Sequence, residues 1–172
     1  GVFNPFSVLN VFDGYKFENY WFQTGTPTFL VKMLMDSNYD LRTLIDGVEA
    51  NAASFNEYRA ESRNPIPLIY QSGYLTIKEY DPRFKTYQLA FPNDEVRYGF
   101  MNFLLPFYSN IPDNEQDFYI GKFVHELESG NINAFLTRLQ AFFADIPYEL
   151  NDQTERHYQT VFYLIFKLMG QF

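Results

Sequence analysis

The chain has 172 residues, which is enough for one medium-sized domain or two small ones with a buried core. Its formal net charge of −8 disfavours tight, non-specific binding to nucleic acid, because that binding depends on clustered lysine and arginine. The absence of cysteine excludes disulfide bonds and thiolate metal sites and is compatible with a cytoplasmic protein. No apolar run reaches the length of a membrane span, and we expect most of the 20 phenylalanines and 14 tyrosines to form core.

The first part of the chain contains two signals in which a capping residue precedes a proline. Asn4-Pro5 predicts a helix that ends at Asp13-Gly14, and Thr26-Pro27 predicts the start of a second helix. Residues 16–22 between them are aromatic and predict an extended segment. A helical turn and then a short strand from Val48 are expected to follow.

The central stretch, residues 66–108, predicts a short helix, two strands and a longer helix. Residues 74–80 and 84–91 are rich in aromatic and β-branched residues, and Asp81-Pro82-Arg83 between them is typical of a turn. Pro92-Asn93-Asp94-Glu95 then supplies a stop, a cap and first-turn acids for a helix with one apolar face. This order of helix, hairpin and helix indicates a winged-helix-like unit.

The residues after 108 predict a helical bundle. Residues 109–114 are typical of a boundary, and two amphipathic helices follow, with a short link at Ser129-Gly130 that predicts an antiparallel pair. A last helix begins near Asn151-Asp152. We therefore predict a mainly α (α+β) chain, in which a helical domain with a winged-helix-like β-hairpin precedes the bundle.

The last helix carries a wide apolar stripe. Such a face is costly to leave in water, so we expect part of it to fold back onto the helix predicted at 132–146 and the rest to form a dimer or higher oligomer. Because residue 1 is glycine and this stripe lies at the end of the chain, we interpret the sequence as part of a longer protein. The stripe consists of Tyr158, Val161, Phe162, Ile165, Leu168 and Met169, widened by Leu164 and Phe166.

Catalytic motifs are scarce in the sequence. No glycine-rich loop ends in Gly-Lys-Ser or Gly-Lys-Thr, so the chain is not predicted to be a P-loop ATPase by itself. The two histidines, His125 and His157, fall on separate predicted helices, which disfavours a metal site built on them. A serine nucleophile in a Gly-x-Ser-x-Gly turn is also missing.

Four charged side chains are candidates for a site. Glu155 has the spacing of a capping box with Asp152, which predicts a structural role at the start of the last helix. Arg83, Lys85 and Arg97 lie on or beside the predicted hairpin and would contact DNA if the unit binds it. The residues around Arg97 are nearly neutral to acidic, which favours contact with protein over reading of a DNA groove.

Three longer strings resemble one bacterial family. They are YWFQTGTPTFL at residues 20–30, LIYQSGYLTI at residues 68–77 and FPNDEV at residues 91–96. They resemble an AAA-ATPase-like family whose members join an ATPase domain to a C-terminal domain of the PD-(D/E)XK nuclease superfamily. ERHYQ at residues 155–159, followed by an apolar helix, resembles the start of that nuclease-like domain. The similarity spans nearly the whole chain.

The resemblance implies that the catalytic cores lie on either side of this chain. The phosphate-binding loop would precede residue 1, and the Asp…Glu-x-Lys metal core would follow residue 172, so ATP and a divalent metal are expected for the intact protein and no cofactor for this stretch. Residues 1–108 would be a lid or winged-helix-like region after the ATPase core, and residues 109–172 a helical region leading into the nuclease-like domain. Glu155 matches a glutamate that related nucleases place near the metal, which makes it a catalytic candidate in the intact protein.

We therefore expect a non-catalytic coupling or interaction module whose partners are the flanking ATPase-like and nuclease-like domains. A DNA-binding winged helix is the alternative, motivated by the order of helix, hairpin and helix. A carbohydrate or small-ligand binder that uses exposed tyrosines rests on composition alone.

Overall fold

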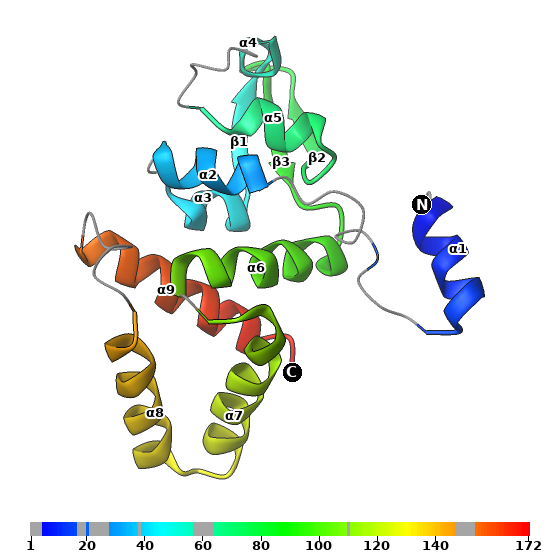
Figure 1. Ribbon diagram of the computed structural model, residues 1–172. Coiled ribbons are helices and arrows are strands. Elements are labelled where there is room, and N and C mark those ends of the chain that lie inside the picture. The colour runs from blue at the N-terminus through cyan, green and yellow to red at the C-terminus, as the bar shows by residue number, and fades with distance from the viewer. Residues whose placement is uncertain are drawn as a thin grey trace. The chain divides into compact units, whose positions relative to one another are not determined.

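The computed structural model describes residues 5–16, 20, 28–37, 39–56, 64–109, 111–146 and 154–172 (Figure 1). The chain is mainly α with one small antiparallel sheet, which confirms the predicted α+β class. It folds into two compact units, Gly1–Phe100 and Met101–Phe172. The division into residues 1–108 and 109–172 that the resemblance implies stays a prediction.

The first unit combines short helices with the sheet, and α2, α3 and α5 lie beside the strands in Figure 1. Pro5 is the first residue of α1, as its fixed φ angle favours. The predicted cap at Thr26-Pro27 and most of the extended segment at 16–22 lie outside the described residues. The elements of this unit are α1 (Pro5–Gly14), α2 (Thr28–Asp36), α3 (Leu41–Asp46), β1 (Val48–Asn51), α4 (Ala52–Asn56), α5 (Ile66–Gln71), β2 (Thr76–Asp81) and β3 (Thr86–Ala90).

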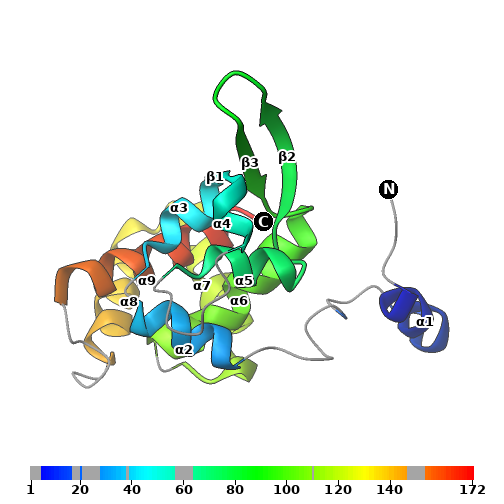
Figure 2. The same ribbon diagram turned by 90° about the horizontal axis from the view of Figure 1, so that it is seen from above.

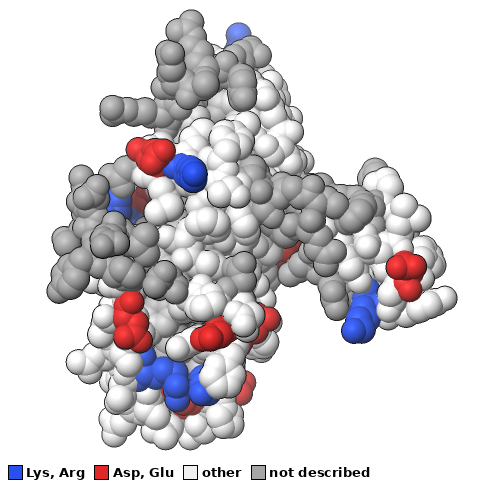
Figure 3. Space-filling view, in the orientation of Figure 1, with Lys and Arg blue, Asp and Glu red and all other residues white. Residues whose placement is uncertain are grey.

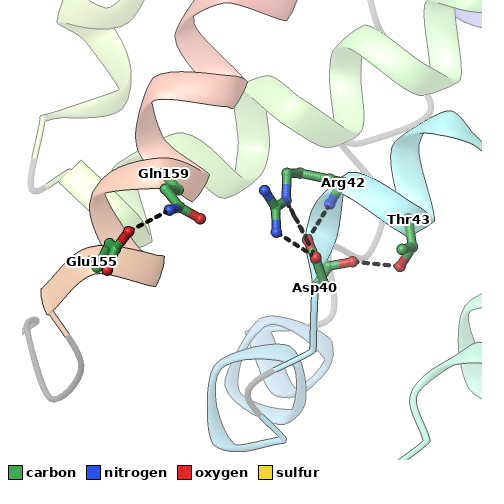
Figure 4. A network of polar contacts seen from close by, with 5 residues as sticks. All are labelled: Asp40, Arg42, Thr43, Glu155 and Gln159. Atoms are coloured by element: carbon green, nitrogen blue, oxygen red, sulfur yellow. Dashed lines mark hydrogen bonds and ion pairs between the residues drawn. The ribbon is translucent and has the colours of Figure 1, made fainter.

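Helix α3 begins at a polar cap that the sequence encodes locally. The Asp40 carboxylate accepts a hydrogen bond from the Arg42 backbone N–H at 3.0 Å and forms an ion pair with the Arg42 guanidinium at 2.8 Å (Figure 4). The Thr43 hydroxyl donates to the Asp40 carbonyl at 2.7 Å. The first of these bonds satisfies the Arg42 N–H, a donor at the helix start that has no partner within the helix itself.

The sheet has the strand order β1-β3-β2, with both pairings antiparallel. The central strand places Leu89 opposite Val48 on one side and Ile77 on the other, and the Leu89 side chain is fully buried. A bulge interrupts the pairing between Ile77 and Glu79 in β2. Lys78 lies at this bulge, and its ammonium group donates to the Pro92 carbonyl at 3.0 Å.

The turn between β2 and β3 begins at Asp81, as predicted, and extends to Lys85. The Asp81 carboxylate accepts from the backbone N–H groups of Arg83 at 2.7 Å and Phe84 at 3.2 Å, which is an Asx-type turn. Lys85 adopts a left-handed conformation with φ of 55°. The hairpin tip is therefore held by its own side chain as well as by the strand pairing.

Helix α6 (Asp94–Ser109) begins in the first unit and ends in the second. Asn93 caps it as predicted, because its side-chain oxygen accepts from the Val96 N–H at 2.9 Å. Val96, Phe100 and Leu104 of the predicted face are buried. The helix buries more of its circumference than that one face, since three further residues are buried in its second half: Met101, Leu105 and Tyr108.

The second unit is a helical bundle of η2 (Asp113–Glu115), α7 (Gln116–Glu128), α8 (Ile132–Ala144) and α9 (Thr154–Met169). As predicted, α7 closes at Ser129-Gly130, where Gly130 takes a left-handed φ of 71°. The Asn131 side chain then caps α8 by accepting from the Ala134 N–H at 3.2 Å. The two helices form a hairpin in Figure 1, and α7 also packs against α9.

Aromatic rings fill the space between α7 and α8. Phe123 of α7 is fully buried and meets Phe135 and Phe142 of α8 edge-on, with centroid distances of 5.7 and 6.0 Å. Tyr119 meets Phe142 at 6.1 Å in the same manner. Edge-to-face contacts of this kind are favourable beyond their apolar area, so Phe123, Phe135 and Phe142 serve the core. The expectation that most aromatic residues form core does not extend to all the described ones, since Phe12, Phe84, Phe118, Phe162 and Phe166 are among those exposed.

The apolar stripe of α9 is covered along most of its width. Val161, Leu164, Ile165 and Leu168 are fully buried, whereas Phe162 and Phe166 keep 45% and 39% of their surface exposed. Phe143 of α8 contacts both Tyr158 and Phe162, so the expected fold-back onto the helix predicted at 132–146 is present. Whether a second copy covers the exposed phenylalanines stays a prediction.

Replacing Phe123 with alanine is expected to destabilise the second unit by about 3–5 kcal/mol, because the substitution leaves a cavity beside the rings of Phe135 and Phe142. Phe118 is the matched control, since it lies on the same helix but is 60% exposed beneath the Lys122 ammonium group. Its replacement should cost no more than about 1 kcal/mol. Chemical denaturation of both variants measures the difference, and equal losses would contradict the described core.

Candidate functional site

Glu155 lies in the first turn of α9 with an exposed side chain. Its carboxylate accepts a hydrogen bond from the Gln159 side-chain amide at 3.1 Å, one turn further along the helix (Figure 4). This is a common surface pair at a spacing of four residues. Asp152, the other half of the expected capping box, lies outside the described residues, so both the capping role and the catalytic role of Glu155 stay predictions.

Arg83 and Lys85 lie at the tip of the β2–β3 hairpin, which extends beyond the helices of its own unit in Figure 2. Both side chains are exposed. The Arg83 guanidinium lies 5.0 Å from the centre of the Phe84 ring, and Phe84 is 65% exposed. The tip thus presents two cations and an aromatic ring to solvent.

Arg97 is placed differently from the other two basic candidates. Its guanidinium forms an ion pair with Asp94 at 2.8 Å and lies 4.9 Å from the centre of the Tyr98 ring. The same group also donates to the Tyr98 hydroxyl at 3.3 Å. Its charge is therefore engaged by neighbours on α6, whereas those of Arg83 and Lys85 face solvent at the hairpin tip.

An exposed apolar surface lies along α8 and α9, and its α9 part, Phe162 and Phe166, belongs to the stripe that the sequence predicts. Phe162 stacks on Phe166 at 4.3 Å and on Phe143 at 6.3 Å. Ile132 and Leu136 belong to the apolar face predicted for α8, yet they are 50% and 54% exposed. That expectation was wrong because α8 is apolar around much of its circumference, and it turns Phe135 and Phe142 inward instead. We call the five residues Ile132, Leu136, Phe143, Phe162 and Phe166 the α8–α9 aromatic surface.

One ion pair joins α7 to α8 beside a hollow between these helices. The Arg138 guanidinium donates through Nε to the Glu126 carboxylate at 2.7 Å, and Glu126 is buried. This hydrogen bond raises the pKa of Arg138, so the guanidinium stays charged. The other carboxylate oxygen of Glu126 is buried without a partner in the described part of the chain. Neither residue stood out in the sequence, because the pair forms only when the helix hairpin closes.

His157 is a half-buried side chain on α9 that stacks on Tyr108 at 5.8 Å. Burial lowers the pKa of His157, and a hydrogen bond with the Tyr108 backbone opposes that effect less strongly. Its Nε2 atom is buried and has no partner within the residues described. A protonated ring would bring an unsatisfied N–H into the interior, which disfavours the charged form. His125, on α7, is exposed.

Among the residues that the structure describes, no group of three His, Asp or Glu side chains is placed to hold a metal ion. Over the same ranges, none of the helices combines the length and the apolar character that crossing a membrane requires. The described candidates are instead surfaces: the hairpin tip, the α8–α9 aromatic surface and the hollow beside Arg138. Fold and surfaces together describe a mainly α chain of two units with a small antiparallel sheet.

The chain is similar to a longer bacterial protein. It is 32% identical over 179 aligned residues to a protein of Azotobacter chroococcum mcd 1 that is described as "Uncharacterized protein in vnfD 5'region". The alignment covers 98% of this chain and 34% of that protein, so the chain spans about a third of its relative's length. No family model and no solved structure matches the chain.

The stability of the second unit is expected to fall as the pH decreases below about 6.5, the ordinary pKa of a histidine. The pKa of His157 is lowered in the folded state, so the unfolded chain takes up the proton first and is favoured. The loss begins near the unfolded pKa and is complete once the pH has passed below the folded pKa. Melting temperatures of the wild type between pH 7.5 and 5.5 should show this decline.

His157→Gln should remove that part of the decline, and His125→Gln should retain it. The two variants each lose one imidazole, so the comparison isolates the buried ring. A decline of equal steepness in His157→Gln and in the wild type would refute the assignment.

Proposed function

We propose that the chain is a non-catalytic coupling module of a larger AAA-ATPase-like and nuclease-like protein. The observation that supports this most is that one uninterrupted helix, α6, belongs to both units. Three sequence strings of the chain resemble that family, and the flanking ATPase-like and nuclease-like domains of the family would be its partners. The greater length of the Azotobacter relative is consistent with further domains beside this region.

Helix α6 is suited to pass a change from one unit to the other. It has 16 residues and is therefore about 24 Å long. Its first half is anchored in the first unit, where Phe100 contacts Tyr74 at 5.2 Å and Phe91 at 5.3 Å. Its last turn is anchored in the second unit by the contact of Tyr108 with His157. Under this proposal, a tilt or rotation of the helix in one unit would act on side chains that pack in the other.

The α8–α9 aromatic surface is the part of the second unit best suited to a partner domain. Ile132, Leu136, Phe162 and Phe166 are each at least 39% exposed, and Phe162 stacks on Phe166. Exposed apolar patches mark interaction sites when their groups adjoin one another. A nuclease-like domain that follows α9 would be the occupant, and a second copy of the chain, through α9, is the alternative. ATP and a divalent metal would bind the flanking domains, and the proposal gives this chain no cofactor.

The coupling is tested by hydrogen exchange after Val96→Ala, which removes a buried side chain from the first half of α6. Amides of α7, α8 and α9 should lose protection along with those of the first unit. Inserting four glycines between Asn102 and Phe103 should confine the loss to the first unit, because glycine breaks helical continuity. Four alanines at the same place are the matched control and should preserve the spread.

A loss of protection that stays within the first unit of the uninterrupted chain would contradict coupling. The non-catalytic part of the proposal is checked separately with the purified chain. It should hydrolyse no nucleotide and cleave no nucleic acid in the presence of Mg²⁺ or Mn²⁺, and clear activity of either kind would refute it.

A DNA-binding winged helix is the second candidate, and the hairpin tip with Arg83, Phe84 and Lys85 favours it. The net charge of −8 and the engagement of Arg97 by Asp94 oppose it. The helix before the hairpin, α5, also contains no basic residue and buries Ile66, Pro67 and Ile69.

Fluorescence anisotropy with duplex DNA at low salt is expected to show weak binding or none. Salt-dependent binding that is lost in the Arg83→Ala/Lys85→Ala double variant would promote this second function. Arg97→Ala is the control, because its guanidinium already has a carboxylate partner and its loss should matter less.

A further inference from the structure

The hollow between α7 and α8 has the features of a small binding site. It has a volume of about 560 Å³ and lies wholly within the second unit. Its α8 side is one helix face that carries Ala134, Arg138, Ala141 and Asp145, and Tyr119 lines it from α7. In Figure 3, basic and acidic side chains lie next to one another over the surface of α7 and α8.

Arg138 does not make this hollow a site for an anion. Two of its nitrogen atoms, Nε and one Nη, already lie against one oxygen of Glu126. The positive charge is therefore compensated by a buried carboxylate. The chain as a whole carries a net charge of −8, which repels anions and attracts cations over longer distances.

Asp145 supplies the hollow with a negative charge that the helix does not favour. It is the C-cap residue of α8, where the helix dipole and the last carbonyl groups already create negative potential. The last turn of α8 contains no basic residue, and Asp145 forms no ion pair among the described residues. A carboxylate in this place lowers the stability of the helix but makes its end attractive to a cation.

Asn133 and Thr137 add polar side chains to the hollow, and the apolar part of its lining suits the aliphatic stem that accompanies an organic cation. Ala134 and Ala141 leave the α8 side of the hollow flat, and the rings of Tyr119 and Phe142 meet at 6.1 Å. Aromatic faces attract ammonium and guanidinium groups. An example occurs elsewhere on α7, where the Lys122 ammonium group lies 3.7 Å from the centre of the Phe118 ring.

We propose that the hollow between α7 and α8 binds an alkylammonium or guanidinium group, with its charge at Asp145 and its stem along Ala141 and Tyr119. The ligand class is a lysine or arginine side chain of a basic peptide, or a free amine with the same group. This site is independent of the coupling role of α6. Arg138 and Glu126 fix the spacing of the two helices and thereby the width of the site.

The test is a titration of the ¹⁵N-labelled full chain at low salt, followed by two-dimensional NMR. One probe is the peptide acetyl-Ala-Ala-Lys-Ala-Ala-amide, and the second is n-butylammonium. Saturable shifts are expected at amides of α8 and around Tyr119. Replacing the lysine of the peptide with norleucine, which keeps the stem and removes the charge, should abolish them.

Asp145→Asn should weaken binding about threefold to fivefold, the upper part of the range expected for one exposed charge pair. Asp117→Asn is the matched control, because Asp117 lies two residues before Tyr119 and therefore on the other side of α7. It should change the affinity by less than about 1.5-fold, since only long-range charge is altered. Asp145→Asn should not lower the melting temperature, so that weaker binding cannot be attributed to unfolding.

Binding of the peptide alone would support a peptide partner, and binding of both probes would extend the site to free amines. Three outcomes would overturn the proposal: neither probe saturates, the norleucine peptide binds as well as the lysine peptide, or Asp117→Asn weakens binding as much as Asp145→Asn.

Discussion

The continuity of α6 across two compact units is the constraint on which the rest of the structure depends. The helix is the connection between packing at Phe100 in the first unit and packing at Tyr108 in the second. The Asn93 cap fixes where this helix begins, directly after the sheet. Pro106 lies within it, and its missing N–H leaves the helix one internal hydrogen bond short near the second anchor. Any softness in the connection is therefore expected close to the bundle and not beside the sheet.

Charged side chains of the second unit occur in two different environments. Glu126 and Arg138 form an ion pair whose carboxylate is buried. Removing one partner of such a pair leaves the charge of the other uncompensated in the interior. Asp145 is exposed and unfavourably placed at the end of α8. The first arrangement holds the helix hairpin together, and the second has no structural benefit that the described contacts account for.

Local sequence signals predicted the elements well where a single residue decides the backbone. The Asn93 cap, the turn that starts at Asp81 and the left-handed Gly130 all appear where the sequence placed them. Each depends on neighbours within four residues, so the interactions that form it can be predicted from the local sequence. The class of the fold follows from these elements and from the apolar periodicity of the helices.

Burial was less predictable where a helix is apolar over a wide arc. Ile132 and Leu136 fit the periodic pattern of α8 as well as Phe135 does, and the positions of α7 and α9 decide which of them is covered. The same holds for the pair of Glu126 and Arg138, which are twelve residues apart and meet only across the hairpin. The contacts of Arg97 with Asp94 and Tyr98 were not predicted either, because they depend on side-chain rotamers that sequence spacing does not fix.

The bulge in β2 has a consequence for how this protein associates with others. A strand at the border of a sheet exposes unpaired backbone groups that can template the addition of a strand from a neighbouring chain, which is a route to aggregation. The irregularity between Ile77 and Glu79 disturbs the spacing of those groups, and the Lys78 ammonium group, tied to the Pro92 carbonyl, adds a charge at the same point. Uncontrolled strand addition along β2 is thereby discouraged.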